Sequence, residues 1–395
     1  MFETLLVIVL AGLVGPLVAA GGRPLLPAVV GELIAGAVLG RTGFGIIDSG
    51  SPTNAFLYSL GFVMLMLVAG SRVQLQGAGL AGGARAAVIA FVVVVVLAVV
   101  AGLAIGGLLG PSAPIALFPI LLAGSSAAVA FPILEERGLL GPRMAMLLAW
   151  IPLADAVTVL LMPLTLMGPE RIPGALMGDA VIVLITVAAL AGGRWIERSG
   201  WERTLSARSR SRGWALQLRV TLLLLLVLSI VADRTGGSTL LAGFGAGLVL
   251  AQLREPERLE VQLSGIAEGF FVPAFFVLLG SELDFRALTG APAAIALALA
   301  LAVATVAIHV AGAWAAAPEP KVPFGLAASA QLGLPAAAAS LGLATGHLSP
   351  AVAAAIVAAG CLTVVPASIG TRRLADAVQG PGAIPRAAAA KEGRA

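Results

Sequence analysis

The sequence predicts an all-α polytopic membrane protein with about thirteen transmembrane helices. Its 395 residues are 59% hydrophobic and 11% charged, and the mean hydropathy is +1.04, which is far above the range of water-soluble domains. Apolar runs of about 20 residues, the length needed to cross a hydrocarbon core of about 30 Å as a helix, recur along the whole chain. The loops between these runs are short, so we expect no sizeable soluble domain.

Charged residues and clusters of Pro and Gly divide the chain into candidate spans. The thirteen spans run roughly over 4–20, 26–40, 54–70, 84–109, 114–135, 142–167, 174–195, 214–232, 237–252, 261–280, 290–316, 322–344 and 350–370. The first has only Glu3 before its apolar stretch and no preceding basic residues. We therefore expect an uncleaved first span rather than a signal peptide.

Lys and Arg predict the orientation in a plasma membrane. With thirteen spans, twenty of the 24 basic residues fall in loops on one face, and only Arg41, Arg171, Arg234 and Arg286 fall on the other. The positive-inside rule then places the N-terminus outside and the C-terminus in the cytoplasm. The basic residues mark loops, and the loop before position 214 is expected to anchor on anionic lipid. The pI near 10.2 therefore does not indicate a nucleic-acid partner.

An internal repeat predicts how the spans are organised. Three short matches recur in order at offsets of 208 to 211 residues: "AGAVL" at Ala35 with "AGLVL" at Ala246, "AGSRVQL" at Ala69 with "LGSELDF" at Leu279, and "RGLLGP" at Arg137 with "TGHLSP" at Thr345. They align spans 1–6 with spans 8–13. Seven spans separate the two copies, so we expect two inverted six-helix repeats, as in many secondary transporters. The expected parts are a first repeat over 1–168, a connector span with a basic loop over 169–213, a second repeat over 214–372 and a short, disordered cytoplasmic tail over 373–395.

In such folds the substrate binds near the midplane, where interrupted helices expose backbone groups. Two spans carry Gly, Ser and Pro at mid-depth: span 5 has Gly124, Ser125, Ser126 and Pro132, and span 12 has Gly333 and Pro335. We therefore expect both helices to break there and to cross. The alternative is two ordinary kinked spans whose Ser hydroxyls bond to their own helix.

Polar residues inside the spans are candidate site residues, because a charged side chain at mid-bilayer costs about 2.5 to 3.5 kcal/mol. Asp155 lies near the middle of span 6 and is expected to hold a proton or a monovalent cation, although a protonated, purely structural Asp is the alternative. His309 is central in span 11, where it either supports the site or bonds a neighbouring helix. Gln331 comes just before the expected break in span 12. Glu32 and Glu268 lie nearer span ends, where side chains can reach water, and are interpreted as structural acids.

No other motif suggests a mechanism. The chain contains no Walker loop for ATP and no nucleophile elbow, and its single Cys361 allows neither an intrachain disulfide nor a Cys-based metal site. We therefore expect a protein that is not an enzyme, with no cofactor and no metal beyond a transported ion.

A series of motifs resembles the monovalent cation/proton antiporters, the sodium- or potassium-exchanging family, second branch. In order they are "PAVVGELIAGAVLG", "LGFVMLMLVAGSRVQL", "AGSSAAVAFPILEERGLL", "PLADAVTVLL" and "FFVPAFFVLLGSELDF". The resemblance covers the membrane part and implies the sodium/proton antiporter-like fold. It also implies a homodimer in which spans 1–3 and 8–10 form the interface. Spans 4–6 and 11–13 would then move as an elevator that carries the ion.

The chain departs from the family pattern at several site positions. The Asp pair that electrogenic members carry in span 6 is reduced to Ala154 and Asp155, and a Lys of span 11 aligns with His309. A Thr after the two serines is replaced by Ala127, and a Glu of span 12 aligns with Gln331. We expect His309, Gln331 and, on span 13, Thr363 to support the site or to sense pH, with His309 pairing with Asp155 when the cation is absent.

One remaining carboxylate favours an electroneutral, one-for-one exchange of Na⁺ or K⁺ for H⁺, driven by the pH gradient at about 1.4 kcal/mol per unit. Ser125, Ser126 and carbonyls at the breaks would complete a shell of oxygen ligands. The residues do not choose between Na⁺, K⁺ and Li⁺. The alternatives are an antiporter-like membrane protein without exchange and an organic-anion symporter on the same fold. No nucleotide-binding domain follows the spans in this sequence.

Overall fold

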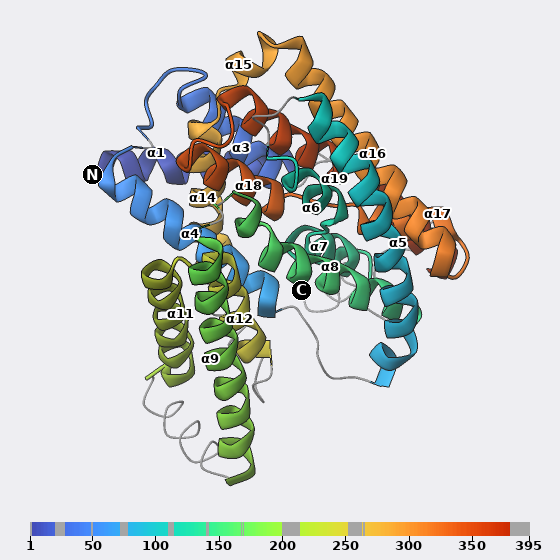
Figure 1. Ribbon diagram of the computed structural model, residues 1–395. Helices are drawn as coiled ribbons and strands as arrows, with labels where there is room; N and C mark the ends of the chain where they lie inside the picture. Colours follow the sequence, from blue (N-terminus) through green and yellow to red (C-terminus); the bar gives the residue numbers. More distant parts are fainter. Residues whose placement is uncertain are drawn as a thin grey trace, which may run out of the picture. The chain divides into compact units, whose positions relative to one another are not determined.

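The computed structural model describes residues 2–19, 28–48, 50–71, 78–109, 114–139, 142–166, 168, 170–199, 214–251, 263 and 265–379, and all regular elements in these ranges are helices (Figure 1). The chain forms two compact units. Unit 1 comprises Met1–Ser51, Gln76–Leu166 and Phe276–Ala395, and unit 2 comprises Pro52–Leu75 and Met167–Phe275.

Unit 1 holds most of the helices. They are α1 (Phe2–Gly12), α2 (Val14–Ala19), α3 (Ala28–Leu39), α5 (Ala78–Leu108), α6 (Leu117–Ala123), α7 (Ala127–Glu136), the 3₁₀ helix η1 (Pro142–Met144), α8 (Ala145–Leu161), the 3₁₀ helix η2 (Pro163–Leu166), all but the first four residues of α14 (Val272–Glu282), α15 (Phe285–Thr289), α16 (Pro292–Ala316), α17 (Lys321–Ala328), α18 (Gly333–Ala344) and α19 (Pro350–Gln379). Their core is built around α5, α6, α8, α16, α17 and α19, which pack against one another.

Small residues set the close packing of unit 1. A side chain at Gly312 of α16 would collide with Val94 of α5, and one at Gly102 of α5 would collide with Pro119 of α6. Glycine at such contacts lets helix backbones approach closely, which is the usual way for helices to associate in lipid. Close approach at these glycines therefore adds to the packing of large buried side chains such as Trp150 and Phe118.

The long helix α5 shows the two faces expected of a membrane helix. Val92, Val96 and Val100, spaced four residues apart, are exposed on one side, and Ala90 and Ala98 are buried on the other. Exposed valines at this spacing form an apolar stripe that suits lipid rather than water.

Unit 2 holds α4 (Pro52–Ser71), α9 (Ile172–Ser199), α11 (Leu216–Thr235), α12 (Thr239–Ala251), the π-helix η3 (Ala267–Phe271) and the start of α14. Figure 1 shows α9, α11 and α12 side by side, and α12 also packs along α4. Gly70 of α4 lies so close to Phe244 of α12 that a side chain there would collide with its carbonyl.

One or more helices overlap each of the thirteen predicted ranges. Eight helical stretches of the described residues are long and apolar enough to cross a membrane, and three shorter apolar helices accompany them. The predicted class, an all-α polytopic membrane protein, is therefore confirmed. The number of crossings, the inverted repeat, the boundaries of the repeats and the connector, and the orientation stay predictions.

The predicted disordered tail is wrong at its start. Helix α19 continues to Gln379, beyond the expected boundary at position 373. It continues because Thr371 and Leu374 are buried one helical turn apart, and so the helix keeps an inward face. Residues 380–395, like the basic loop over 200–213, lie outside the described residues.

Candidate functional site

Both helices that were expected to break do so, within unit 1. Helix α6 ends at Ala123 and α7 begins at Ala127, while α17 ends at Ala328 and α18 begins at Gly333. The segments between them, 124–126 and 329–332, are not helical and lie against each other, as the hydrogen bonds described next show. We call this contact the crossing.

Three hydrogen bonds join the two segments of the crossing. The Ser125 hydroxyl donates to the Ala328 carbonyl over 2.7 Å, and the Ser126 amide donates to the Ala330 carbonyl over 2.8 Å. In the opposite direction, Nε2 of Gln331 donates to the Gly124 carbonyl over 2.6 Å. Backbone groups that the broken helices leave unpaired in a membrane interior are thereby satisfied by the other segment.

The second break lies earlier than the glycine and proline positions predicted. Gly333 and Pro335 belong to the first turn of α18, and the non-helical segment precedes them. Proline fits the first turn because the amide that it lacks would have no helical partner there. Pro335 therefore lies in the first turn of a helix instead of interrupting one. Pro132 lies in the interior of α7 and does not end that helix either.

Asp155 of α8 lies at the first break. Its side chain is only 4% exposed, and its Oδ2 accepts a hydrogen bond of 3.0 Å from the amide of Ala127, the first residue of α7. A helix N-terminus stabilises a negative charge through its free amides and its dipole. The predicted site residues Asp155, Ser125 and Ser126 are thus brought together by the structure.

His309 of α16 is fully buried beside the crossing. Its Nδ1 is 2.8 Å from the Thr305 carbonyl, which can only accept, so Nδ1 carries a proton. The ring stacks on Trp150 with centroids 5.8 Å apart. Nε2 is buried without a hydrogen-bond partner, and the Gly124 backbone lies near the ring. The hypothesised pairing of His309 with Asp155 is not present in this structure.

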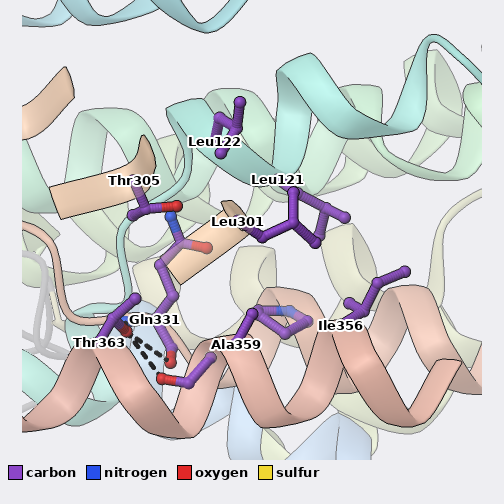
Figure 2. A pocket seen from close by; sticks show the side chains of 10 residues that line it. Leu121, Leu122, Leu301, Thr305, Gln331, Ile356, Ala359 and Thr363 are labelled. Carbon is purple, nitrogen blue, oxygen red and sulfur yellow. Dashed lines mark hydrogen bonds between the residues drawn. The ribbon is translucent and has the colours of Figure 1, made fainter. Parts of the chain in front are cut away.

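Gln331 and Thr363 connect the crossing to α19. The backbone amide of Gln331 donates to Oγ1 of Thr363 over 3.1 Å, and this hydroxyl donates to the Gly360 carbonyl over 2.7 Å. A pocket of about 10 Å³, on the order of the space for one water, adjoins these residues. Figure 2 shows the Gln331 amide extending toward Thr305 in this pocket, whose other walls are mainly apolar side chains of α6, α16 and α19.

The two acids interpreted as structural lie on helices other than those of the crossing. Glu32 of α3 is 4% exposed, and its Oε2 is buried without a hydrogen bond. The expectation that Glu32 reaches water is therefore wrong, because α2 packs over it at Gly15, which has no side chain to hold the helices apart. Glu268 is exposed, in the π-helix η3 of unit 2. Its structural role stays a prediction.

One buried acid was missed by the sequence reasoning. Asp179 of α9 is 3% exposed, and its Oδ1 accepts a hydrogen bond of 2.7 Å from the amide of Ser238, which directly precedes α12. Its position inside the predicted span 174–195 was a signal that could have found it. Because Asp179 lies in unit 2, on helices other than those of the crossing, we do not include it in the candidate site.

A bundle of apolar helices in which two broken helices cross beside a buried carboxylate is typical of secondary transporters. The comparison with protein families agrees with this class. The model of the family described as "Sodium/hydrogen exchanger, transmembrane" matches residues 5–376, so the chain belongs to this family of membrane transporters and is not an enzyme.

Curated relatives carry matching names. The chain is 24% identical over 305 residues to the putative Na⁺/H⁺ antiporter YjbQ of Bacillus subtilis, an alignment that covers 72% of this chain and 48% of that protein. It is 24% identical over 272 residues to the probable Na⁺/H⁺ antiporter 3 of Methanocaldococcus jannaschii, covering 67% of each. It is 29% identical over 288 residues to the chloroplastic K⁺ efflux antiporter 2 of Arabidopsis thaliana, covering 68% of this chain and 23% of that protein. The chain thus spans about half the length of YjbQ and less of the plant protein.

A solved structure shows the same fold. The sodium proton antiporter MjNhaP1 of Methanocaldococcus jannaschii, determined at pH 8, superposes with a TM-score of 0.61 over 96% of this chain and 97% of that chain, at 17% identity. The predicted sodium/proton antiporter-like fold is therefore confirmed.

Proposed function

We propose that the protein exchanges one monovalent cation, Na⁺ or K⁺, for one proton, and that Asp155 carries both in turn. The observation that supports this proposal is the position of Asp155: a buried carboxylate at the N-terminus of α7, beside the crossing of two broken helices. The names of the relatives include both Na⁺/H⁺ and K⁺ antiporters, so either cation fits the comparison.

The neutral character of the other groups at the crossing supports a one-for-one exchange. The C-terminal ends of α6 and α17 both lie at the crossing, so their carbonyls and the negative ends of their helix dipoles point into it. The carbonyls of Gly124 and Ala328 are bonded by the uncharged side chains of Gln331 and Ser125. With Asp155 as the acid at this place, the site has the same net charge whether it holds a proton or a cation. The exchange is therefore electroneutral.

Oxygen atoms near Asp155 are suited to a hard cation. The carboxylate supplies the charge, the hydroxyls of Ser125 and Ser126 lie on the adjoining segment, and carbonyls of the breaks supply further ligands. Ala127 has a methyl group where a hydroxyl would add a ligand, so this chain binds the cation with fewer side-chain oxygens. Competition of the cation and the proton for one carboxylate couples the two fluxes.

We further infer, from the family, a homodimer in the plasma membrane that works by an elevator motion of the part carrying the crossing. The N-terminus lies outside and the C-terminus in the cytoplasm. The transported ions are the only ligands that this mechanism requires.

Proton release in proteoliposomes tests the exchange. The purified protein is reconstituted with a pH-sensitive dye inside, and pulses of Na⁺, K⁺ or Li⁺ are added outside at several pH values. We expect cation-induced proton movement that disappears in Asp155→Asn, because the amide does not titrate and has no negative charge to balance the cation. Asp179→Asn is the matched control, since it makes the same change at another buried Asp and should keep the exchange.

The outcomes separate the alternatives. No response to any of the three cations at any pH contradicts the proposal and favours an antiporter-like protein without exchange. Proton movement that requires an organic anion instead of a cation favours a symporter on the same fold.

A further inference from the structure

The side chain of Gln331 makes a contact that cation and proton binding do not by themselves explain. It is buried, and its Nε2 donates to the Gly124 carbonyl over 2.6 Å. Gly124 is the first residue after α6, where the backbone turns to an extended conformation with ψ of 155°. The bond from Gln331 therefore holds the chain at the point where the helix breaks.

From Gly124 the chain reaches Asp155 through a short, fixed path. Ser125 is bonded to Ala328 and Ser126 to Ala330, and the next amide, that of Ala127, donates to Asp155. Gly124 begins this segment, so its bond to Gln331 adds a third attachment to those of Ser125 and Ser126 and helps to fix the direction of the Ala127 amide. The Ala127 amide stabilises the ionised carboxylate of Asp155. The direction of this amide therefore affects the equilibrium between the protonated and the ionised carboxyl group.

Gln331 is itself fixed from the other side. Its backbone amide donates to Thr363 of α19, and the Thr363 hydroxyl is anchored on the Gly360 carbonyl. Hydrogen bonds and the backbone of residues 124–127 thus connect α19, through Gln331 and the first break, to Asp155.

We propose that Gln331 is a positioning residue for the exchange: its amide holds Gly124 so that the Ala127 amide stays on Asp155, and it does so at every pH because an amide does not titrate. This inference rests on the proposed function, since it concerns the same carboxylate. It assigns to the neutral residue at position 331 a role that an acid there would fill only while protonated.

The titratable groups around this contact are few in the part of the chain that the structure describes. Of the helices that line the pocket, α16 brings His309, whose ring lies near the Gly124 backbone, and α19 brings Cys361, which does not line the pocket. The other charged residues of α19, Arg372, Arg373 and Asp376, follow Thr363 by more than two helical turns. Helices α6 and α18 contain no titratable side chain. Asp155 of α8 is reached through the break. A carboxylate introduced at 331 has the size of the amide, so it changes the chemistry of the contact and not the packing.

The test compares Gln331→Glu with Gln331→Met, which has a similar size but never donates. Exchange is measured in proteoliposomes as a function of pH, relative to the native protein at each pH. Gln331→Glu should stay within about twofold of the native rate at acidic pH, where the carboxyl donates to Gly124. It should lose about tenfold or more at alkaline pH, where it repels that carbonyl, because tenfold corresponds to the loss of one hydrogen bond of about 1.4 kcal/mol. Gln331→Met should lose about tenfold at every pH without a change in the shape of the profile.

If the exchange rate of Gln331→Glu returns on acidification, the variant is folded. If Gln331→Glu does not fold, the exchange rate of Gln331→Met alone tests the inference. A native pH profile for Gln331→Glu, or a native rate for Gln331→Met, overturns the inference. Exchange that persists in Gln331→Glu combined with Asp155→Asn also overturns it, because the introduced acid would then carry the ion.

Failure of the proposed function is distinguishable from failure of this inference. If the native protein moves no cation, the proposed function fails, and the positioning is tested by melting temperature in detergent. The melting temperature of Gln331→Glu should then equal that of the native protein at acidic pH and be lower at alkaline pH. Equal melting at both pH values overturns the positioning role.

Discussion

At the scale of single residues, the site is defined by which groups are charged and which are not. Asp155 is held by one backbone amide, and the neighbouring carbonyls of the crossing are bonded by Ser125 and Gln331. The sequence indicated Asp155 because a carboxylate in an apolar membrane helix is energetically costly and is usually functional. It did not indicate that Gln331 bonds the opposite break, because partners more than 200 positions apart are set by the packing of four helices.

His309 gives a residue-scale prediction that differs from the expectation of a pH sensor. The Nδ1–H of His309 donates to the Thr305 carbonyl, and the imidazole stacks on Trp150. The ring is therefore not bonded to Asp155. We expect His309→Gln to leave the shape of the pH profile of exchange unchanged and to lower stability by about 1 to 3 kcal/mol, since it removes the buried ring that stacks on Trp150 and bonds the Thr305 carbonyl. Proton flux against pH and thermal unfolding in detergent measure the two effects. A profile displaced along the pH axis would instead support direct pairing with Asp155.

At the scale of elements, hydropathy predicted where helices lie better than where they break. The apolar runs gave a helix in every expected range, because their length and composition are dictated by the bilayer. The second break lies before Pro335 in the sequence and not at it, since proline is compatible with a first helical turn. Gly and Pro therefore indicated the right helices, but the exact break depended on bonds from the opposite segment.

The contact between α9 and α12 gives an element-scale prediction. Asp179 bonds the amide of Ser238, and the Ser238 hydroxyl in turn accepts from the Leu241 amide. Together they satisfy two amides at the start of α12, as a capping box does within one helix. We expect Asp179→Ala to cost about 1 to 2 kcal/mol of stability. Asp179→Asn keeps an acceptor oxygen and should cost less. Unfolding midpoints of the two variants in detergent check this order, which equal losses would contradict.

At the scale of the whole molecule, the sequence was most informative about the solvent that surrounds the protein. The share of hydrophobic residues and the split of basic residues between alternate loops follow from the bilayer and predict a polytopic membrane protein without knowledge of any contact. The stoichiometry of exchange is also a property of the whole cycle, but it depends on the charge of one site. The sequence already favours one-for-one exchange because one acid remains, and the structure adds that the groups bonded around that acid at the crossing are uncharged.

The response to membrane potential tests that stoichiometry. A potential of 100 mV is worth about 2.3 kcal/mol for each elementary charge moved across the membrane. A cycle that moves one net charge would therefore shift its equilibrium cation ratio by about 50-fold at this potential. Because Asp155 holds either one cation or one proton, we expect no shift when a potential is imposed on proteoliposomes by an ionophore for an ion that is not transported. Ala154→Asp is an informative comparison, since a second acid beside Asp155 could carry an additional proton. A shift near 50-fold in the native protein would show that another group also carries charge, and the one-for-one exchange would then be wrong.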